Sequence, residues 1–426
     1  MLKPLALLLS LFGLLCAAIL TRNGDLIWMT LPFLTYLGLG LLRSPTTAQI
    51  RLRATRSATK KNSRDESTPI EVSVTIRNDG DELVHLRLVD AVQAGMKITM
   101  GQTEQSVVVR AGEEALIQYA FQSERGSFAW KRIGVIVSDP IGLIETPLDL
   151  PAEAEIRVQP QRLKFRPFPL HPQNTLHSAG SIPARLAGNG TNFWGVREYH
   201  PGDPLRRLDW RLTARHPGQF FTKEFEQEEI ADIGLILDAR QKTDLRLGDD
   251  SLFEHSARAA ASLAEVFLRQ GNRVSLLIYR RHMINVFPGY GKVQLNRILR
   301  ALAQATTEEE SSFNSLQFLP LRMFSSHSLI VIISPLAADD WRLFPRLRAY
   351  GYQVLVISPD ALDYARPLLP TDRITQFASR LTRIERQSEI DKITQLWIPV
   401  IDWQIDQPLA PLVRNALARS HIQRQR

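Results

Sequence analysis

Two uncharged apolar runs near the N-terminus constrain the fold of this chain more than any other feature. Residues 4–20 read PLALLLSLFGLLCAAIL and residues 26–42 read LIWMTLPFLTYLGLGLL. Each run is near the lower limit of the ~17–25 residues that a membrane-spanning helix needs. The TRNGD stretch between them contains the turn-forming pair Asn23-Gly24. We therefore expect residues 1–43 to form a transmembrane helical hairpin, with spans at about 4–20 and 26–42. A cleaved signal peptide followed by one anchor is the alternative, but Leu15-Cys16-Ala17 is a poor cleavage site.

Basic residues flank these runs on their outer sides. Lys3 precedes the first run, and the second run is followed by Arg43, Arg51, Arg53, Arg56, Lys60 and Lys61. The positive-inside rule then puts both ends in the cytoplasm. The predicted location is the bacterial inner (plasma) membrane, multi-pass, with the soluble domains facing the cytoplasm. The basic segment 43–61 is expected to contact anionic lipids, which explains much of the net charge of +8.

Residues 48–160 have the pattern of an all-β domain. Short runs alternate apolar and polar residues, and turn signals separate them: residues 70–77, 83–89, 106–110, 115–121 and 132–138. Such runs at short spacing predict an antiparallel β-sandwich. Asp139-Pro140-Ile141-Gly142 fits a type I turn. We interpret this domain as a spacer or interaction module, because no His, Asp and Glu residues occur at metal-ligand spacing. The single cysteine, Cys16, rules out a disulfide framework within one chain.

Residues 161–228 combine a proline-rich linker with the most distinctive motif of the chain. Prolines from Pro151 to Pro183 predict an extended connector over residues 151–185. In the motif, arginines alternate with aromatic residues, as they do in nucleic-acid-binding surfaces. Carboxylates are mixed among them, however, which favours internal Arg–carboxylate pairs and argues against nucleic acid. We expect an ordered loop and a short helix, clamped by bidentate ion pairs and by packing of Trp194 and Trp210. The residues expected to have a structural or partner-binding role are Phe193, Arg197, Glu198, Tyr199, Gly202, Asp203, Arg206, Asp209, Trp210 and Arg215.

The same motif carries a family resemblance. Residues 193–215, FWGVREYHPGDPLRRLDWRLTAR, resemble the signature of the bacterial domain-of-unknown-function 58 family. The runs Arg125–Phe128 and Ser138–Leu143 and the paired N-terminal apolar runs also look like this family, so the resemblance covers nearly the whole chain. It implies a von Willebrand factor A-like C-terminal domain. It also implies a gene beside a MoxR-type AAA+ ATPase, and a role in assembling or activating other complexes.

Residues 229–426 independently have the pattern of a doubly wound α/β domain. Strands are predicted at 231–238, 273–279, 283–287, 328–334, 352–358 and 397–402, with helices at 252–270, 291–305, 340–350, 384–395 and 408–419. Only Arg280 to His282 separate the second and third strands, so this pair is expected to be antiparallel. An early antiparallel pair of this kind agrees with the von Willebrand factor A-like fold that the resemblance implies.

The loop after the first of these strands has lost the pattern of a metal site. The metal-binding version of the fold has Asp-x-Ser-x-Ser, whereas this chain has Asp238-Ala239-Arg240-Gln241-Lys242, and Pro335 replaces a further expected aspartate. Because Mg²⁺ needs several oxygen ligands, we predict a degenerate site without metal. Arg240 and Lys242 are then a hypothetical contact for a partner's carboxylate. The alternative is that both are solvated surface charges.

No enzyme motif is recognisable. The chain has no Walker A sequence, HExxH or nucleophile elbow, and its nine histidines are scattered. We expect no cofactor, no catalytic residue and no enzymatic activity. The predicted function is that of a membrane-anchored scaffold or adaptor that binds protein partners, including a MoxR-type AAA+ ATPase. Two alternatives are a hydrolase with its site on the 193–215 motif and a cell-envelope structural protein without an ATPase partner.

Overall fold

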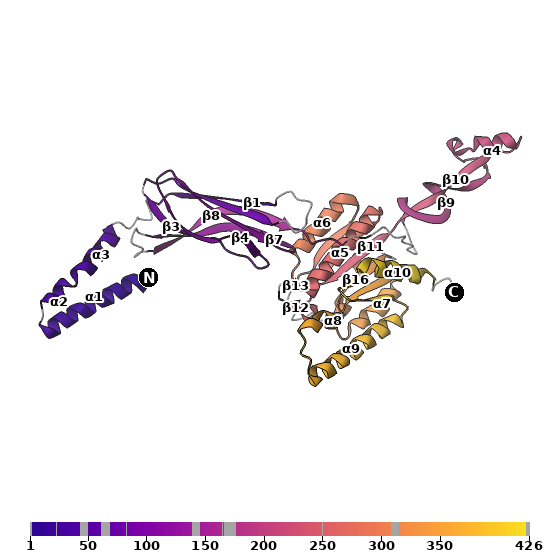
Figure 1. Ribbon diagram of the computed structural model, residues 1–426. Coiled ribbons are helices and arrows are strands. Elements are labelled where there is room, and N and C mark those ends of the chain that lie inside the picture. The colour runs from indigo at the N-terminus through magenta and orange to yellow at the C-terminus, as the bar shows by residue number, and fades with distance from the viewer. Residues whose placement is uncertain are drawn as a thin grey trace. The chain divides into compact units, whose positions relative to one another are not determined.

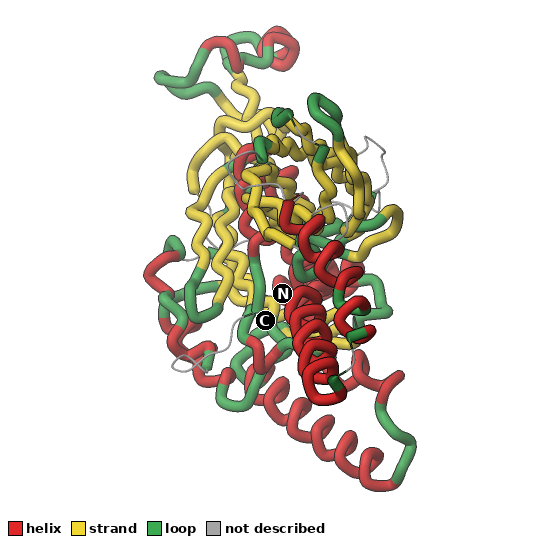
Figure 2. Tube along the Cα trace, turned by 90° about the vertical axis from the view of Figure 1, so that its left-hand side faces the viewer, coloured by secondary structure: helices red, strands yellow, loops and turns green. Residues whose placement is uncertain are grey.

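The computed structural model of the chain divides into two compact units, Met1–Val158 and Gln159–Arg426, and each is described here by itself (Figure 1). The structure describes all residues except 1, 23, 43–49, 61–68, 82, 139–144, 164, 166–175, 249, 308–314, 327 and 423–426. The predicted turn at 139–142 therefore lies outside the described residues, as do residues 164 and 166–175 of the proline-rich linker. Figure 2 distinguishes helices from strands by colour in a second view.

The N-terminal apolar runs form three helices: α1 (Leu2–Thr21), α2 (Asp25–Trp28) and α3 (Leu31–Leu42). Across the described ranges, no helix is both long enough and apolar enough to cross a membrane. The predicted transmembrane hairpin is therefore wrong. Both runs are helical, but the second is interrupted between Trp28 and Leu31, where the Thr30 hydroxyl donates a hydrogen bond to the Ile27 carbonyl at 2.6 Å. Pro32, in the first turn of α3, lacks the N–H that would continue the preceding helix.

The rest of the first unit consists of two four-stranded antiparallel sheets with one shared core. The first sheet has the order β1-β2-β6-β4 and the second the order β5-β3-β7-β8. Strand β2 illustrates why these segments pair: Ile70, Val72, Val74 and Ile76 are all buried, while the residues between them face outward. The strands are β1 (Leu52–Lys60), β2 (Ile70–Asn78), β3 (Val84–Val89), β4 (Lys97–Gly101), β5 (Glu104–Val109), β6 (Glu114–Gln122), β7 (Gly126–Ser138) and β8 (Glu145–Val158).

Two of the prolines expected in an extended connector lie inside strands. Pro151 is in β8, which is an edge strand, so its missing N–H interrupts no pairing with a further strand. Pro183 is in β9 (Leu176–Glu198), which pairs with β10 (Phe221–Ile230) in a two-stranded ribbon with several irregularities of register. The connector predicted for 151–185 is therefore shorter than expected at both ends.

A buried ion pair lies within the core of the first unit. The Arg56 guanidinium forms an ion pair with Asp90, and both side chains are fully buried. The Tyr119 hydroxyl donates to the second oxygen of Asp90 at 2.9 Å, and Arg56 also donates to the Ala152 carbonyl at 2.7 Å. Burial raises the pKa of Asp90, and the Arg56 charge opposes that shift. Arg56, counted in the basic segment expected to contact lipid, thus ties β1 to the opposite sheet.

The second unit is built on a six-stranded mixed sheet with the order β15-β14-β11-β16-β17-β18. All neighbouring strands are parallel except β14 and β15, so the predicted antiparallel pair is confirmed. The fold class as predicted is nevertheless corrected. The structure shows a mixed sheet covered by helices in the second unit and antiparallel sheets in the first unit. It has no transmembrane hairpin among the described residues, and it does not confirm a von Willebrand factor A fold. The strands are β11 (Asp232–Asp238), β14 (Arg273–Tyr279), β15 (Ile284–Gly289), β16 (Leu329–Ile333), β17 (Gln353–Pro359) and β18 (Val400–Trp403), with a separate short pair β12 (Arg246–Leu247) and β13 (Asp250–Ser251).

Helices cover both faces of the mixed sheet (Figure 1). On one face, α5 (Leu252–Arg269), α6 (Gly291–Gln304) and α10 (Leu409–Ile422) pack over Leu235, Leu276 and Val331. On the other face, α7 (Leu343–Ala349) and the end of α9 (Arg373–Thr394) pack over Ile236, Leu277 and Ile332. The short helix α8 (Ala361–Ala365) follows β17. Helix α9 begins at Arg373, whereas the sequence predicted a helix from residue 384.

Replacing Arg56 with methionine should destabilise the first unit strongly. Removal of one partner of a buried ion pair leaves an uncompensated charge, which costs about 3–5 kcal/mol. We expect this loss in the free energy of unfolding of R56M, measured by urea denaturation of the full-length chain. Arg53 is a matched control, because it lies on the same strand with a side chain that is 77% exposed. R53M should change the free energy by no more than ~0.5 kcal/mol, and equal losses in the two variants would contradict the prediction.

Candidate functional site

The distinctive motif forms a small structure at the end of the β9–β10 ribbon (Figure 1). Strand β9 ends at Glu198, opposite Phe221, the first residue of β10. The chain between them contains the 3-10 turn η1 (Leu205–Arg207) and the helix α4 (Trp210–Arg215). An isolated bridge between Leu208 and Thr222, both buried, fastens this connection to β10. We call residues 193–224 the ribbon tip.

Arg197 joins the parts of the ribbon tip. Its two terminal nitrogens donate to the two carboxylate oxygens of Asp203 at 2.7 and 2.8 Å, and its Nε donates to Glu224 at 2.8 Å. Asp203 also accepts the backbone N–H of His200 at 3.0 Å. Arg197 therefore connects the end of strand β9, the loop that follows it and the facing strand β10. One bidentate ion pair of the kind expected for the motif is therefore present, between Arg197 and Asp203.

The ion pair sets the ionisation of Asp203. The hydrogen bonds from Arg197 and from the His200 N–H lower the pKa of Asp203 to about 2. Its hydrogen bonds to Asp203 and to Glu224 raise the pKa of Arg197. Because Asp203 titrates below the ordinary range of an aspartate, its contribution to order in the loop is present above about pH 4 and is lost as the pH falls toward 2. At neutral pH this carboxylate is held in an ion pair and carries no proton to transfer.

Asp209 starts helix α4. Its carboxylate accepts the backbone N–H groups of Arg211 and Leu212, both at 3.1 Å, as an N-cap residue does. The Thr213 hydroxyl accepts the Phe221 N–H at 3.1 Å, so the helix is also attached to the start of β10. Gly202 has φ +114°, a conformation that favours glycine, and it turns the chain just before Asp203.

Large apolar side chains are exposed on this ordered scaffold. The exposed fractions are 59% for Phe193, 67% for Leu205, 65% for Trp210 and 55% for Phe220. The expected packing of Trp210 is therefore wrong, since two thirds of the residue faces solvent, and the side chain of Trp194 lies outside the described residues. Leu205 and Phe220 were not predicted from the sequence, because nothing in a local pattern distinguishes an exposed leucine or phenylalanine from a buried one.

The structure gives the predicted motif residues different roles. Arg197 and Asp203 form the clamp, Asp209 caps α4, Gly202 makes the turn, and Tyr199 packs edge-on against Phe220 with ring centroids 6.3 Å apart. The Glu198 carbonyl accepts a hydrogen bond from Arg197, while the Glu198 side chain is exposed. The remaining four side chains, Phe193, Arg206, Trp210 and Arg215, are exposed.

The second predicted site lies at the carboxyl end of strand β11 and is filled by Arg240. The guanidinium donates to both oxygens of Asp238, at 2.8 and 2.7 Å, and to both oxygens of Asp340, at 3.1 and 2.7 Å. Arg240 is fully buried, so in this structure its charge serves these two carboxylates and not a surface for a partner. Lys242 is exposed. Asp340 was not predicted, because it lies 100 residues from Arg240 in the chain.

Neutral donors complete this buried group. The Ser334 hydroxyl donates to Asp238 at 2.6 Å, and the backbone N–H groups of Leu316 and Ala337 donate to Asp340 at 2.9 and 2.8 Å. Two carboxylates and one guanidinium carry a net charge of −1, which these donors stabilise. Burial alone would lower the pKa of Arg240, but the two aspartates outweigh it and raise that pKa. The arginine is thus a permanent cation at the place where the sequence predicts a degenerate metal site.

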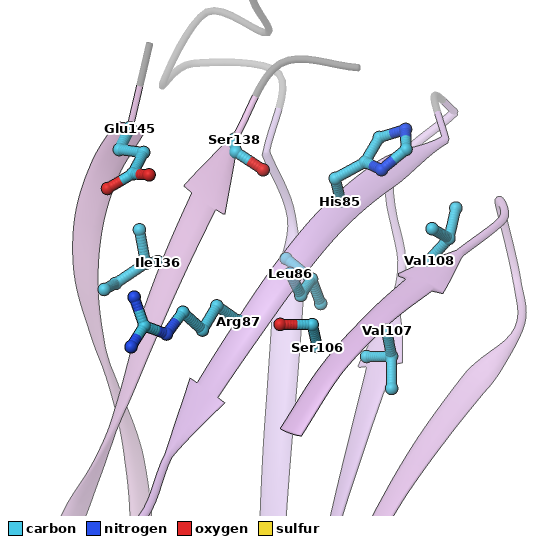
Figure 3. Close-up of a pocket in the computed structure, with 9 residues that line it drawn as sticks. All are labelled: His85, Leu86, Arg87, Ser106, Val107, Val108, Ile136, Ser138 and Glu145. Carbon is cyan, nitrogen blue, oxygen red and sulfur yellow. The ribbon is translucent and has the colours of Figure 1, made fainter. Parts of the chain in front are cut away.

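Two other features of the described residues bring polar side chains together. His255 contacts Asp250 at 2.7 Å through Nε2, and its ring packs against Tyr364. In the first unit, a hollow of about 280 Å³ on the open face of the β5-β3-β7-β8 sheet is lined by His85, Arg87 and Ser138 among others (Figure 3). Over the ranges that the structure describes, His, Cys, Asp and Glu side chains nowhere gather in a group of three or more that could hold a metal ion.

The second unit is thus an α/β domain with a ribbon tip that Arg197 clamps. The comparison with known protein families matches the part of the chain that contains most of the motif. Residues 195–385 match the family model described as "Protein of unknown function DUF58". This match is narrower than the resemblance over nearly the whole chain that the sequence suggested. The "Uncharacterized protein YeaD" of Bacillus subtilis (strain 168) is 28% identical over 184 residues, which are 42% of this chain and 43% of that protein. The chain thus aligns with less than half the length of this relative.

Solved structures resemble the chain only weakly. Proximal thread matrix protein 1 from the mussel byssus matches with a TM-score of 0.27 and 11% identity, covering 44% of this chain and 46% of that one. A FixG-related protein from Vibrio parahaemolyticus matches with a TM-score of 0.17 and 12% identity, covering 24% of this chain and 94% of that one. At these scores neither similarity bears on function.

Replacing Arg197 with glutamine should loosen the ribbon tip. Glutamine cannot form the charged fork that holds Asp203, so the amides of His200 and Asp203 should exchange hydrogen roughly tenfold faster. Hydrogen exchange with mass spectrometry on the full-length chain measures this change. Arg211→Gln is the control, because Arg211 lies in the same tip with an exposed side chain. If R197Q and the parent chain protect residues 199–209 equally, the clamp does not order the loop.

Replacing Arg240 with methionine should destabilise the second unit by about 3–5 kcal/mol at pH 7.5, because two buried carboxylates then lack a cation. The loss relative to the parent chain should be smaller at pH 4.5, since a protonated carboxyl is much less costly to bury. Denaturant unfolding at both pH values tests this expectation. K242M, at an exposed position on the same loop, should change stability by no more than ~0.5 kcal/mol. A loss in R240M that does not depend on pH would contradict the electrostatic explanation.

Proposed function

We propose that this chain is a non-catalytic adaptor that binds protein partners through its ribbon tip. The observation that carries the proposal is the exposure of four large apolar side chains, Phe193, Leu205, Trp210 and Phe220, on a tip that one arginine clamps. A surface that is ordered before binding loses less conformational entropy on association. Exposed apolar side chains on an ordered tip are therefore better explained by recognition than by chance.

The residue types of the tip support a protein partner. Trp and Arg are enriched among the residues that contribute most to protein–protein binding. Trp210 is accompanied by the exposed side chains of Arg206, Arg211 and Arg215. A partner with an apolar pocket and neighbouring carboxylates would match this combination. The resemblance described above motivates a MoxR-type AAA+ ATPase as the partner to test first.

The chemistry of the motif argues against the hydrolase alternative. A general base or acid must exchange a proton near the working pH. The Asp203 carboxylate is paired with Arg197, which keeps its pKa at about 2. Both motif aspartates already have structural partners, because Asp209 accepts two backbone N–H groups at the start of α4. We therefore assign Asp203 and Asp209 to the folding of the tip.

The proposal is tested by a pull-down with the tagged full-length chain after chemical crosslinking, with and without ATP. The triple variant L205A/W210A/F220A should recover any specific partner at least tenfold less than the parent, since single truncations at binding hot spots already cost ~2 kcal/mol or more. Quantitative mass spectrometry compares the two samples. An AAA+ ATPase whose recovery depends on both the tip and the nucleotide is the expected outcome.

Phe287→Ala is the matched control for surface hydrophobicity. Phe287 lies on the edge strand β15, and it is 74% exposed. This variant should capture the partner as well as the parent does. Equal recovery by the parent and the triple tip variant would refute the proposed role of the tip. A substrate turnover that D203N abolishes in a folded chain would instead establish the hydrolase.

A further inference from the structure

Helix α9 carries a row of exposed apolar side chains in its first three turns. The exposed fractions are 79% for Ile374, 72% for Phe377, 50% for Leu381 and 66% for Ile384. Asp372 caps the helix by accepting the Thr375 N–H at 3.2 Å, so the segment has a defined start. Side chains of this size gain free energy when they are removed from water. A helical segment that exposes them along its length is stabilised by a partner.

The row is on the side of α9 that faces away from the sheet. Near the other end of the helix, Ile390 and Ile393 are buried against the domain. Arg386 is fixed on the same side, because its guanidinium donates to the carbonyls of Pro335 and Ser358 at 2.9 and 3.0 Å. At 3.6 residues per turn, these three positions lie almost opposite the exposed row. The row is thus a second apolar face and not an extension of the core face.

The spacing of the row is that of a two-stranded helix pair. The intervals from Ile374 to Phe377, Leu381 and Ile384 are three, four and three residues, which is the a-d-a-d pattern of two heptads. The stripe is narrow, because charged residues lie beside it, namely Arg373, Arg380 and Glu385, and the opposite side of the helix carries Thr375, Gln376, Ser379 and Thr382. A helix that lies in a lipid surface needs a broader apolar face. The pattern therefore favours another helix over a membrane.

Charges beside the row identify which helix fits. With Ile374 at position a, Arg380 is at position g and Glu385 is at position e of the next heptad. In a parallel, in-register pair, a g residue faces the following e residue of the other helix, and such pairs determine partner and orientation. Two copies of α9 would thus form two Arg380–Glu385 pairs. In an antiparallel pair g faces g, so Arg380 would face Arg373 of the other copy.

We propose that α9 pairs with α9 of a second copy of this chain, in parallel and in register, with Ile374, Phe377, Leu381 and Ile384 at the interface. Two heptads are fewer than the three or four that usually sustain a coiled coil. The pair is therefore a concentration-dependent monomer–dimer equilibrium. It uses a surface separate from the ribbon tip, so it does not depend on the proposed adaptor function.

Charge reversal tests both the partner and the orientation. Sedimentation velocity of the purified full-length chain should show a dimer that increases with concentration. R380E and E385R should each weaken dimerisation about tenfold, because like charges then face each other twice. The double variant R380E/E385R should restore it. Q376R, at an exposed position outside the row, is the control and should dimerise like the parent.

Cysteine crosslinking gives an independent readout. The chain has a single cysteine, Cys16, so a C16S background carries one introduced thiol. Oxidation of C16S/L381C should give a disulfide-linked dimer, because a positions of parallel helices face each other, whereas C16S/Q376C should not. The proposal is overturned if the parent stays monomeric at 100 µM, if the double charge reversal fails to restore dimers, or if I374C crosslinks preferentially to I384C. Binding of the monomer to anionic vesicles through the row would also overturn it, by assigning the row to lipid.

Discussion

The buried cation of Arg240 is the interaction on which the carboxyl edge of the mixed sheet depends. It joins Asp238, at the end of β11, to Asp340, in the segment after β16, and Ser334 and two backbone N–H groups complete the network. Removing these charges from water is unfavourable. Their mutual attraction offsets this desolvation penalty only because every carboxylate oxygen accepts a hydrogen bond. The network holds the loop after β11 and the segment after β16 to each other through one permanent positive charge.

Three arginines each hold segments of the chain together through an ion pair with a carboxylate, but they differ in burial. Arg56 is fully buried in the first unit, Arg240 is fully buried in the second, and Arg197 is partly exposed at the ribbon tip. Each connects segments that are far apart in the sequence or loosely held, and each has a carboxylate as its main partner. The consequences differ with burial. At the two buried positions an arginine without its carboxylate would be an unpaired charge in the core, whereas at the tip solvent would screen it. Arg197 thus orders a surface without making the stability of the unit depend on it.

The sequence predicted the elements that short-range periodicity determines. The strand β2 and the helix α5 follow from alternating and helical spacing, and the antiparallel partner of β14 follows from the shortness of the loop after it. The Arg197–Asp203 pair was also foreseeable, because both residues lie within one short motif. Errors arose where the outcome depends on distant residues. Asp340 completes a site begun at Asp238, and no local pattern indicates that partner. The start of α9 does not follow from the sequence in this way, because its first apolar residues do not face the core. Apolar composition alone likewise does not show that the second N-terminal run is divided into two helices.

The ribbon tip and the row on α9 both expose apolar side chains, but different interactions keep the two surfaces ordered. At the ribbon tip, large side chains are scattered on a short, irregular connection, and an ion pair supplies the rigidity that a core would otherwise provide. On α9 the helix itself supplies the rigidity, and the apolar residues follow one regular spacing. An irregular rigid surface suits a partner of a different shape, whereas a regular helical row with complementary charges suits a copy of itself. If both surfaces are occupied together, two ribbon tips are held in one assembly, and a partner with several equivalent binding sites gains affinity without any new contact.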